Sequence, residues 1–237
     1  MDNTVKEPLI HLSKREDMSF GKKWLVRIIA ILLSLIVCAG FIFIIIKMNP
    51  VEVYEGIVEG AVGTGRRFWV TARDALTLLC VAVAVTPAFK MKFWNIGAEG
   101  QILMGCVASA AMMIYAGNAL PTGLLLVLMF VCSFIAGGIW GIIPAFFKAR
   151  WNTNETLFTL MLNYVAMQVV TFCIVYWENP AGSNSVGIIN APTRAGWLPQ
   201  LFGLDYGWNL AIVLLLTVLM FIYMKRTKHG YEIAVVG

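Results

Sequence analysis

The sequence predicts an all-α protein that crosses a membrane about six times. Of its 237 residues, 59% are hydrophobic and only 13% are charged, whereas charged residues make up about 25% of a typical soluble domain. The mean hydropathy is +0.79. Long apolar runs recur along the chain, and each approaches the roughly 20 residues that a bilayer-spanning helix needs. These observations favour a polytopic membrane protein.

Six apolar runs are the expected spans. The first covers residues 24–46 and is longer than the apolar core of a signal peptide, so we expect it to stay as an anchor. The second is bounded by Arg73 and Asp74 on one side and by Lys90 on the other. The spans after the first are expected at residues 72–89, 96–117, 122–147, 156–177 and 208–224.

The polar segments between the spans have distinct characters. Residues 1–23 form an expected cytosolic tail, and residues 225–237 form the start of a cytosolic segment. Within residues 47–71, apolar residues recur at helical spacing, which predicts an amphipathic interfacial helix that ends near Gly63. Residues 178–207 are rich in Gly, Pro, Asn and Ser and are expected to form a loop.

The distribution of basic residues predicts the orientation. With the N-terminus in the cytosol, 13 of the 18 Lys and Arg residues lie on the inner side of the membrane. Cytoplasmic loops carry such an excess, so it also explains the net charge of +5 without a nucleic-acid partner. The five basic residues on the outer side are Lys47, Arg66, Arg67, Arg73 and Arg194.

Residue types that support catalysis or metal binding are sparse. The five cysteines lie inside apolar runs without a CxxC pair, and His11 and His229 lie in polar flanks. The phosphate-binding pattern G-x-x-x-x-G-K-[ST] does not occur. We therefore expect no catalytic residue, no metal ligand and no bound ATP in this chain, and do not expect an enzyme.

A polar stretch, NIGAEGQ at residues 95–101, adjoins the third span. A carboxylate at the middle of a membrane helix costs about 2.5–3.5 kcal/mol, so Glu99 needs a reason to be there. One interpretation is helix-start chemistry, with Asn95 as N-cap and Glu99 in the first turn. The other is a broken helix in which Gly97 and Gly100 open the backbone, and Glu99 and Gln101 face a solute path.

A second polar stretch, NETLFTLMLNY at residues 154–164, opens the fifth span. Asn152 and Glu155 have the spacing of a capping box. Thr159 and Asn163 follow Glu155 at four-residue steps, so the three side chains are expected on one helix face. Asn163 lies deeper in the span and needs a partner, either an interhelical hydrogen bond or a solute in a pore.

Small residues mark two of the spans. The fourth contains Gly137, Gly138 and Gly141, and the third contains Gly105 followed by two alanines at three-residue steps. Small side chains let membrane helices approach closely. We expect close helix packing at these positions.

The two polar stretches together resemble a known family. NIGAEGQILMG and, after it, NETLFTLMLNY are similar to segments of the permease subunits of bacterial ABC importers, in the branched-chain amino acid/ribose-type superfamily. The nucleoside branch, which works with a basic-membrane-lipoprotein-type binding protein, is the most similar. Residues 49–64 and 226–237 extend the resemblance, which covers about residues 49–237. Trp94 stands where the family usually has Phe, and Leu157, Phe158 and Val165 are conservative differences.

The resemblance implies an ATP-driven importer, with nucleosides or related simple sugars as solute. Its implied partners are a separate ABC ATPase subunit that binds ATP, a second permease subunit (the same or a sister chain), an external solute-binding lipoprotein and membrane lipid. It also implies a bacterial cell membrane, about ten spans in all, and a coupling region that continues past Gly237. Residues hypothesised to line or brace the solute path are Asn95, Glu99, Gln101, Asn154, Glu155 and Asn163. Gly97 and Gly100 are the hypothesised helix break or hinge, and Gly230, Tyr231 and Glu232 the hypothesised ATPase contacts.

One other class of transporter remains open from the residues alone. Buried carboxylates and broken helices also serve ion-coupled secondary transporters and channels that work without an ATPase. The energy source distinguishes the two classes, because a protonophore abolishes ion-coupled uptake and loss of the ATPase does not.

Overall fold

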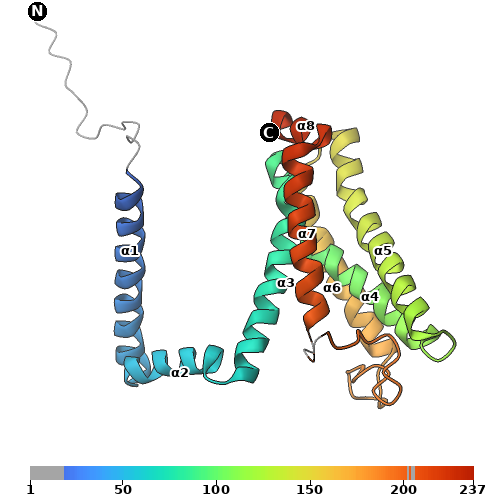
Figure 1. Cartoon of the computed structure of the whole chain (residues 1–237), viewed down its shortest axis with the longest axis horizontal. Coiled ribbons are helices and arrows are strands. Elements are labelled where there is room, and N and C mark those ends of the chain that lie inside the picture. Colours follow the sequence, from blue (N-terminus) through green and yellow to red (C-terminus); the bar gives the residue numbers. More distant parts are fainter. Residues whose placement is uncertain (1–18, 202, 204–205) are drawn as a thin grey trace, which may run out of the picture. The chain divides into compact units, whose positions relative to one another are not determined.

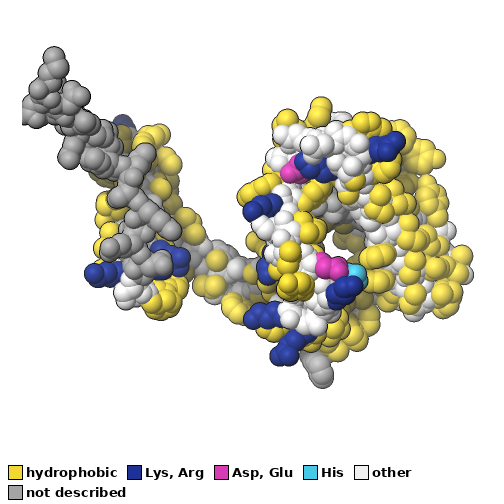
Figure 2. Space-filling model, turned by 90° about the horizontal axis from the view of Figure 1, so that it is seen from above, with side chains coloured by type: hydrophobic (Ala, Val, Ile, Leu, Met, Phe, Trp, Pro, Cys, Tyr) yellow, Lys and Arg dark blue, Asp and Glu magenta, His cyan; other side chains and the backbone are white. Residues whose placement is uncertain are grey.

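The computed structural model describes residues 19–201, 203 and 206–237, and every regular element among them is a helix. The chain divides into two compact units, Met1–Trp69 and Val70–Gly237. Most of the tail expected at residues 1–23, with His11, lies outside the described residues. Hydrophobic side chains cover much of the surface of each unit (Figure 2).

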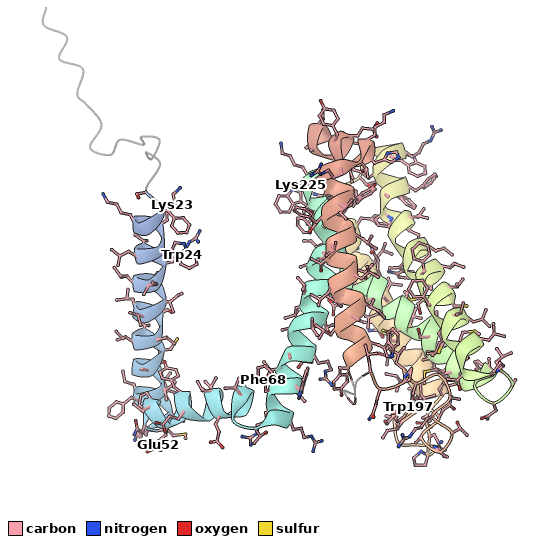
Figure 3. The ribbon with its side chains drawn as sticks, viewed as in Figure 1. Lys23, Trp24, Glu52, Phe68, Trp197 and Lys225 are labelled. Atoms are coloured by element: carbon pink, nitrogen blue, oxygen red, sulfur yellow. The ribbon has the colours of Figure 1, made fainter. Side chains whose placement is uncertain are left out.

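The first unit consists of a long apolar helix and a shorter amphipathic one (Figure 1). Helix α1 (Phe20–Phe41) continues as the π-helical turn η1 (Ile42–Ile46). Helix α2 (Pro50–Val62) starts where the Asn49 side chain accepts a hydrogen bond from the Val51 amide. The Tyr54 hydroxyl donates to the Leu35 carbonyl at 2.7 Å and joins α2 to α1. Figure 3 shows Trp24 near the start of α1 and Glu52 on α2.

The second unit is a bundle with one short terminal helix. Helix α3 (Gly65–Lys90) enters it at Val70. It is followed by α4 (Ala98–Ala116), α5 (Thr122–Trp151), α6 (Glu155–Tyr176), α7 (Gly207–Arg226) and α8 (Lys228–Val236). Among the described residues, the closest helix packing in this unit is of α4 against α5 and α6, while α8 follows directly on α7.

Six helices are long and apolar enough to cross a membrane, which confirms the predicted architecture. Most of their ends lie within two residues of the predicted bounds, and the main difference is α3, which begins at Gly65 and not near residue 72. Charged side chains interrupt the apolar run there without interrupting the helix. The Thr64 hydroxyl accepts from the Arg67 amide, Arg67 pairs with Glu59 at 3.4 Å, and Asp74 pairs with Arg73.

The two ends of the second unit differ in charge. We call one end the basic end, because helices α3, α5 and α7 finish there and carry its basic residues. The opposite, loop end carries the connection between α6 and α7. Figure 3 shows Lys225 at the basic end and Trp197 at the loop end. The basic end contains Lys90, Lys92, Lys148, Arg150, Lys225, Arg226 and Lys228.

Helix α4 begins inside the bundle, well away from the basic end where α3 finishes (Figure 1). Residues 91–97 are not helical and lead the chain inward. The start of α4 contacts Asn163, which lies eight residues into α6, or about 12 Å along the helix axis. The start of α4 therefore lies beside the middle of the candidate span α6, although the Ile96 and Glu99 side chains are exposed.

The start of α4 is held by one side chain of α6. Asn163, only 5% exposed, accepts a hydrogen bond from the Gly100 amide at 2.9 Å. Its own amide donates to the Ile96 carbonyl at 3.0 Å. The fit needs glycine, because a Cβ atom at Gly97 would lie 2.9 Å from the Thr159 Cβ atom, and one at Gly100 would lie 2.9 Å from the Asn163 oxygen. Asn163 thus makes the interhelical hydrogen bond that was one of its two interpretations.

Small residues also bring α4 close to α5. A Cβ atom at Gly137 would lie 3.1 Å from the Gln101 carbonyl oxygen, and one at Gly141 would lie 3.1 Å from the Gln101 side-chain nitrogen. Further along α4, the Ser133 hydroxyl donates to the Gly105 carbonyl at 2.9 Å. The close packing predicted at Gly105, Gly137 and Gly141 is confirmed, whereas at Gly138 a Cβ atom would meet nothing within 4 Å, so the prediction was wrong there.

The connection between α6 and α7 folds onto the loop end of α4 and α5. The Asn190 side-chain amide donates to the Met113 carbonyl at 2.8 Å and to the Ala195 carbonyl at 3.1 Å. Gly196 has a φ of +80° and rests against Met113 and Leu125, where a side chain would meet both strain and crowding. These contacts fix a part of the chain that the sequence describes only as a loop.

The α4–α5 contact predicts a difference between two adjacent glycines. Gly137→Leu should lower the free energy of unfolding by roughly 1–3 kcal/mol, because the new side chain must displace α4. Gly138→Leu is the matched control, since a Cβ atom there meets nothing within 4 Å. Thermal unfolding of the purified protein in detergent would measure both. Equal midpoints for the two variants would contradict the described packing.

The two hydrogen bonds of Asn163 with Gly100 and Ile96, which we call the Asn163 clamp, predict a second stability difference. Asn163→Leu should destabilise the protein by about 1–3 kcal/mol for each buried backbone group of α4 that loses its partner. Gln168→Leu, at an exposed position on the same helix, is the control and should change little. Protease sensitivity of residues 91–97 would report whether the start of α4 has been released. An unchanged cleavage rate in Asn163→Leu would argue against the clamp.

Candidate functional site

A cavity of about 810 Å³ lies between α3, α4 and α5, beside the start of α4. Figure 2 shows the second unit hollowed between its helices. Such a volume is within the range of small-molecule sites, about 300–1,000 Å³. Its walls are mainly small or apolar side chains, and Ile189 of the α6–α7 connection also contributes. The larger wall residues are Val81, Val85, Ile102, Met113, Phe130 and Phe134.

Four polar side chains other than cysteine line the cavity: Asn95, Gln101, Ser109 and Ser133. The two serines hydrogen-bond to each other. The Asn95 oxygen accepts from the Gly97 amide at 3.0 Å, while its side-chain NH₂ donates to no described residue. The side-chain amide of Gln101 makes no hydrogen bond to any described residue either. The cavity therefore holds amide groups available to a ligand.

Asn95 does not cap α4 as predicted. The helix begins at Ala98, and Gly97 occupies the N-cap position. The Asn95 oxygen instead closes a tight turn with Gly97, two residues ahead, because the chain enters the bundle as a non-helical segment. Gly100 lies inside continuous α4, so the interruption lies before this helix and not within it. A hinge role for Gly97 and Gly100 stays a prediction.

Glu99 occupies the first turn of α4 and is exposed. This position confirms the first-turn placement of Glu99, though not Asn95 as its N-cap, and the partial positive charge of a helix N-terminus stabilises a carboxylate there. Among the described residues, Glu99 forms no ion pair. Its place in a solute path stays a prediction.

Asn154 and Glu155 lie at the basic end and do not line the cavity. Asn154 is the N-cap of α6, and its oxygen accepts from the Leu157 amide at 3.2 Å. The capping box expected from Asn152 is wrong, because Asn152 ends α5 in a left-handed conformation with a φ of 50°. Glu155 pairs with Lys148 at 3.0 Å. Both residues thus have structural partners where α5 turns into α6.

The six predicted path residues therefore separate in space. Asn95 and Gln101 line the cavity, whereas Asn163 does not line it and instead hydrogen-bonds to the start of α4. The sequence prediction missed Ser109 and the aromatic wall of α5. One signal for Ser109 was present, because Gln101, Gly105 and Ser109 recur at four-residue steps and share one face of α4.

Helix α8 is fixed to the end of α7. The Thr227 hydroxyl accepts from the Gly230 amide at 3.1 Å and caps α8. Gly230 is buried against the Met224 carbonyl, where a Cβ atom would clash. Tyr231 is 72% exposed, and Glu232 pairs with basic side chains of its own helix. The ATPase contacts hypothesised for Gly230, Tyr231 and Glu232 would thus be made by a helix with one fixed and one exposed side.

The described residues contain no group of three His, Cys, Asp or Glu side chains placed to hold a metal ion. All five cysteines are free thiols. Cys80 and Cys106 contribute to the cavity wall.

Comparison with known proteins finds three curated relatives. The chain is 29% identical over 226 residues to the nucleoside ABC transporter permease protein NupB of Lactococcus lactis, a match that covers 91% of this chain and 61% of the relative. It is 29% identical to the guanosine ABC transporter permease protein NupP of Bacillus subtilis, with 90% and 61% covered. It is 27% identical to the glucose ABC transporter permease protein TsgB13 of Haloferax volcanii, with 86% and 56% covered.

The chain thus matches only 56–61% of the length of these relatives. Among solved structures, none gives a significant match to the chain. The family model described as "Branched-chain amino acid transport system / permease component" matches residues 69–237, which is more than half of the chain. That region contains the cavity, the Asn163 clamp and α8. The chain therefore belongs to this family of transport-system permease components.

Proposed function

We propose that this chain forms the membrane-spanning solute path of an ATP-driven importer for nucleosides or related simple sugars. The observation that carries the proposal is the cavity beside the start of α4, where the side-chain amide of Gln101 hydrogen-bonds to no described residue. Amide groups donate to and accept from sugar hydroxyls and base edges. The names of the curated relatives, which specify nucleosides, guanosine and glucose, support the same solute classes.

The proposed orientation places the basic end in the cytosol of a bacterium. Lysine and arginine concentrate on the cytoplasmic side of membrane proteins, and seven of them lie at this end of the second unit. The N-terminus is then cytosolic as well. The loop end faces outward, where a solute-binding lipoprotein would deliver its ligand close to the connection that folds over α4 and α5.

Helix α8 is the proposed contact with a separate ATPase subunit. It lies at the basic end and exposes Tyr231 and, one turn later, Val235, which is 64% exposed. Its capped start and the buried Gly230 join it firmly to α7. A displacement of α8 would therefore be transmitted to α7. ATP binding by the partner would in this way shift the equilibrium between the inward-open and outward-open states.

A second permease subunit, the same chain or a sister chain, completes the proposed assembly. Glu99 supports this part, because an exposed carboxylate at membrane depth is costly in lipid and needs protein or water around it. The same residue also keeps an ion-coupled carrier as the second candidate, since such carriers use intramembrane carboxylates for coupling.

Reconstitution tests the proposed function. The complete permease, with its ATPase and binding protein, would be placed in liposomes, and uptake of labelled nucleosides and glucose measured with and without ATP. We expect uptake that requires ATP and persists with a protonophore. Uptake that needs an ion gradient and ignores ATP would establish the second candidate. No uptake of any nucleoside or sugar by an assembled complex would refute the proposal.

The exposed side of α8 gives a prediction about coupling. Tyr231→Ala should reduce transport-linked ATP hydrolysis several-fold and leave the unfolding midpoint unchanged, because the side chain is exposed. Tyr176→Ala, a comparably exposed tyrosine at the loop end, is the control and should leave the hydrolysis rate at the wild-type value. Normal ATPase stimulation in Tyr231→Ala would remove α8 as the contact.

A further inference from the structure

We propose that Gln101 determines the specificity of the cavity by reading the edge of the base of an uncharged nucleoside. This proposal rests on the proposed function and deepens it. It names the residue that distinguishes one base from another, and it also excludes phosphorylated and zwitterionic solutes.

No Asp, Glu, Lys, Arg or His occurs among the described residues that line the cavity. A phosphate, or the carboxylate and ammonium groups of an amino acid, would enter without a counter-charge, and unpaired buried charges are costly. The site therefore accepts neutral solutes.

The cavity is open and mainly apolar. Met113 and the largely exposed rings of Phe130 and Phe134 line it with apolar surface that suits the face of a heterocyclic ring. A hexose carries hydroxyl groups around its whole ring, and most of them would face these walls without a hydrogen-bond partner. A nucleoside separates its flat base from its hydroxylated ribose, which matches a cavity with few polar groups.

Gln101 lies against α5, where Gly137 and Gly141 leave room for it. A Cβ atom at Gly137 would lie 3.1 Å from the Gln101 carbonyl oxygen, and one at Gly141 would lie 3.1 Å from the Gln101 side-chain nitrogen. The glycines therefore bring the amide against α5 at the cavity wall. Its oxygen and NH₂ group, which bond no described residue, present an acceptor beside a donor. Such a pair matches a base edge that carries a donor beside an acceptor, as adenine does.

Base selectivity of the permease without its binding protein tests the proposal, because in the complete importer the binding protein also selects the solute. Dissociation constants of the purified permease for adenosine, guanosine, uridine, cytidine and unsubstituted purine riboside would be measured, with AMP and leucine as competitors. In the wild type we expect the best nucleoside to bind about tenfold more tightly than purine riboside, the equivalent of about 1.4 kcal/mol. We expect neither competitor to displace it.

Three variants isolate the amide. Gln101→Leu should bring the five dissociation constants within about twofold of one another. Gln101→Glu, which offers only acceptors when ionised, should shift the preference toward guanosine, whose base edge carries adjacent donors. Gly141→Ala leaves Gln101 in place but pushes on its side chain, and should weaken selectivity in the same direction as Gln101→Leu. Gln168→Leu removes an exposed amide of α6 and should keep the wild-type order.

The outcomes separate this proposal from the proposed function. If the wild type imports no nucleoside or sugar, the proposed function fails. If the wild type imports nucleosides and the assembled Gln101 variants keep the wild-type ratios, or if AMP competes as well as adenosine, the specificity proposal is overturned. Failure of all three variants to assemble would also overturn it, because Gln101 would then serve only in helix packing.

Discussion

The two hydrogen bonds that Asn163 makes, with Gly100 in the first turn of α4 and with Ile96 just before it, are the interaction on which the site depends. A helix that starts at membrane depth exposes backbone groups that no water can satisfy, and only protein can provide their partners. Asn163 provides one acceptor and one donor from a neighbouring helix. Because α4 can start there, Gln101 lies beside the cavity and not at the basic end.

The sequence predicted the fold class and the six spans well, because hydropathy depends on composition over a whole helix. It could not place the depth of α4, since that depends on which residue of α6 meets Gly100. Single caps were also ambiguous. Asn152 and Asn154 are two residues apart and either one fits a helix start, but Asn152 ends α5 and only Asn154 caps α6. Asn95 bonds forward to Gly97 for a similar reason, since its backbone is not yet helical.

The candidate site shows the same limit. A polar residue in an apolar run needs a partner, but the sequence does not show whether that partner is a backbone group, a charged side chain or a solute. Asn163 hydrogen-bonds to backbone groups, and Glu155 forms an ion pair with Lys148. Of these three residues, only Gln101 has a side-chain amide that faces the cavity and bonds no described residue. Phe130 and Phe134 carried no signal in the sequence, because an aromatic residue inside a membrane span reads the same whether it faces lipid or a cavity.

The placement of Glu99 has a consequence for small ions. The N-terminus of a helix is a ready-made anion-binding site, because its free amides and its dipole both attract negative charge. At the start of α4 such a site would lie deep in the protein, next to the proposed solute path. Glu99 supplies a carboxylate in that first turn. Helix α4 thus carries its own covalently attached counter-charge at this end, and its negative charge disfavours chloride and phosphate there.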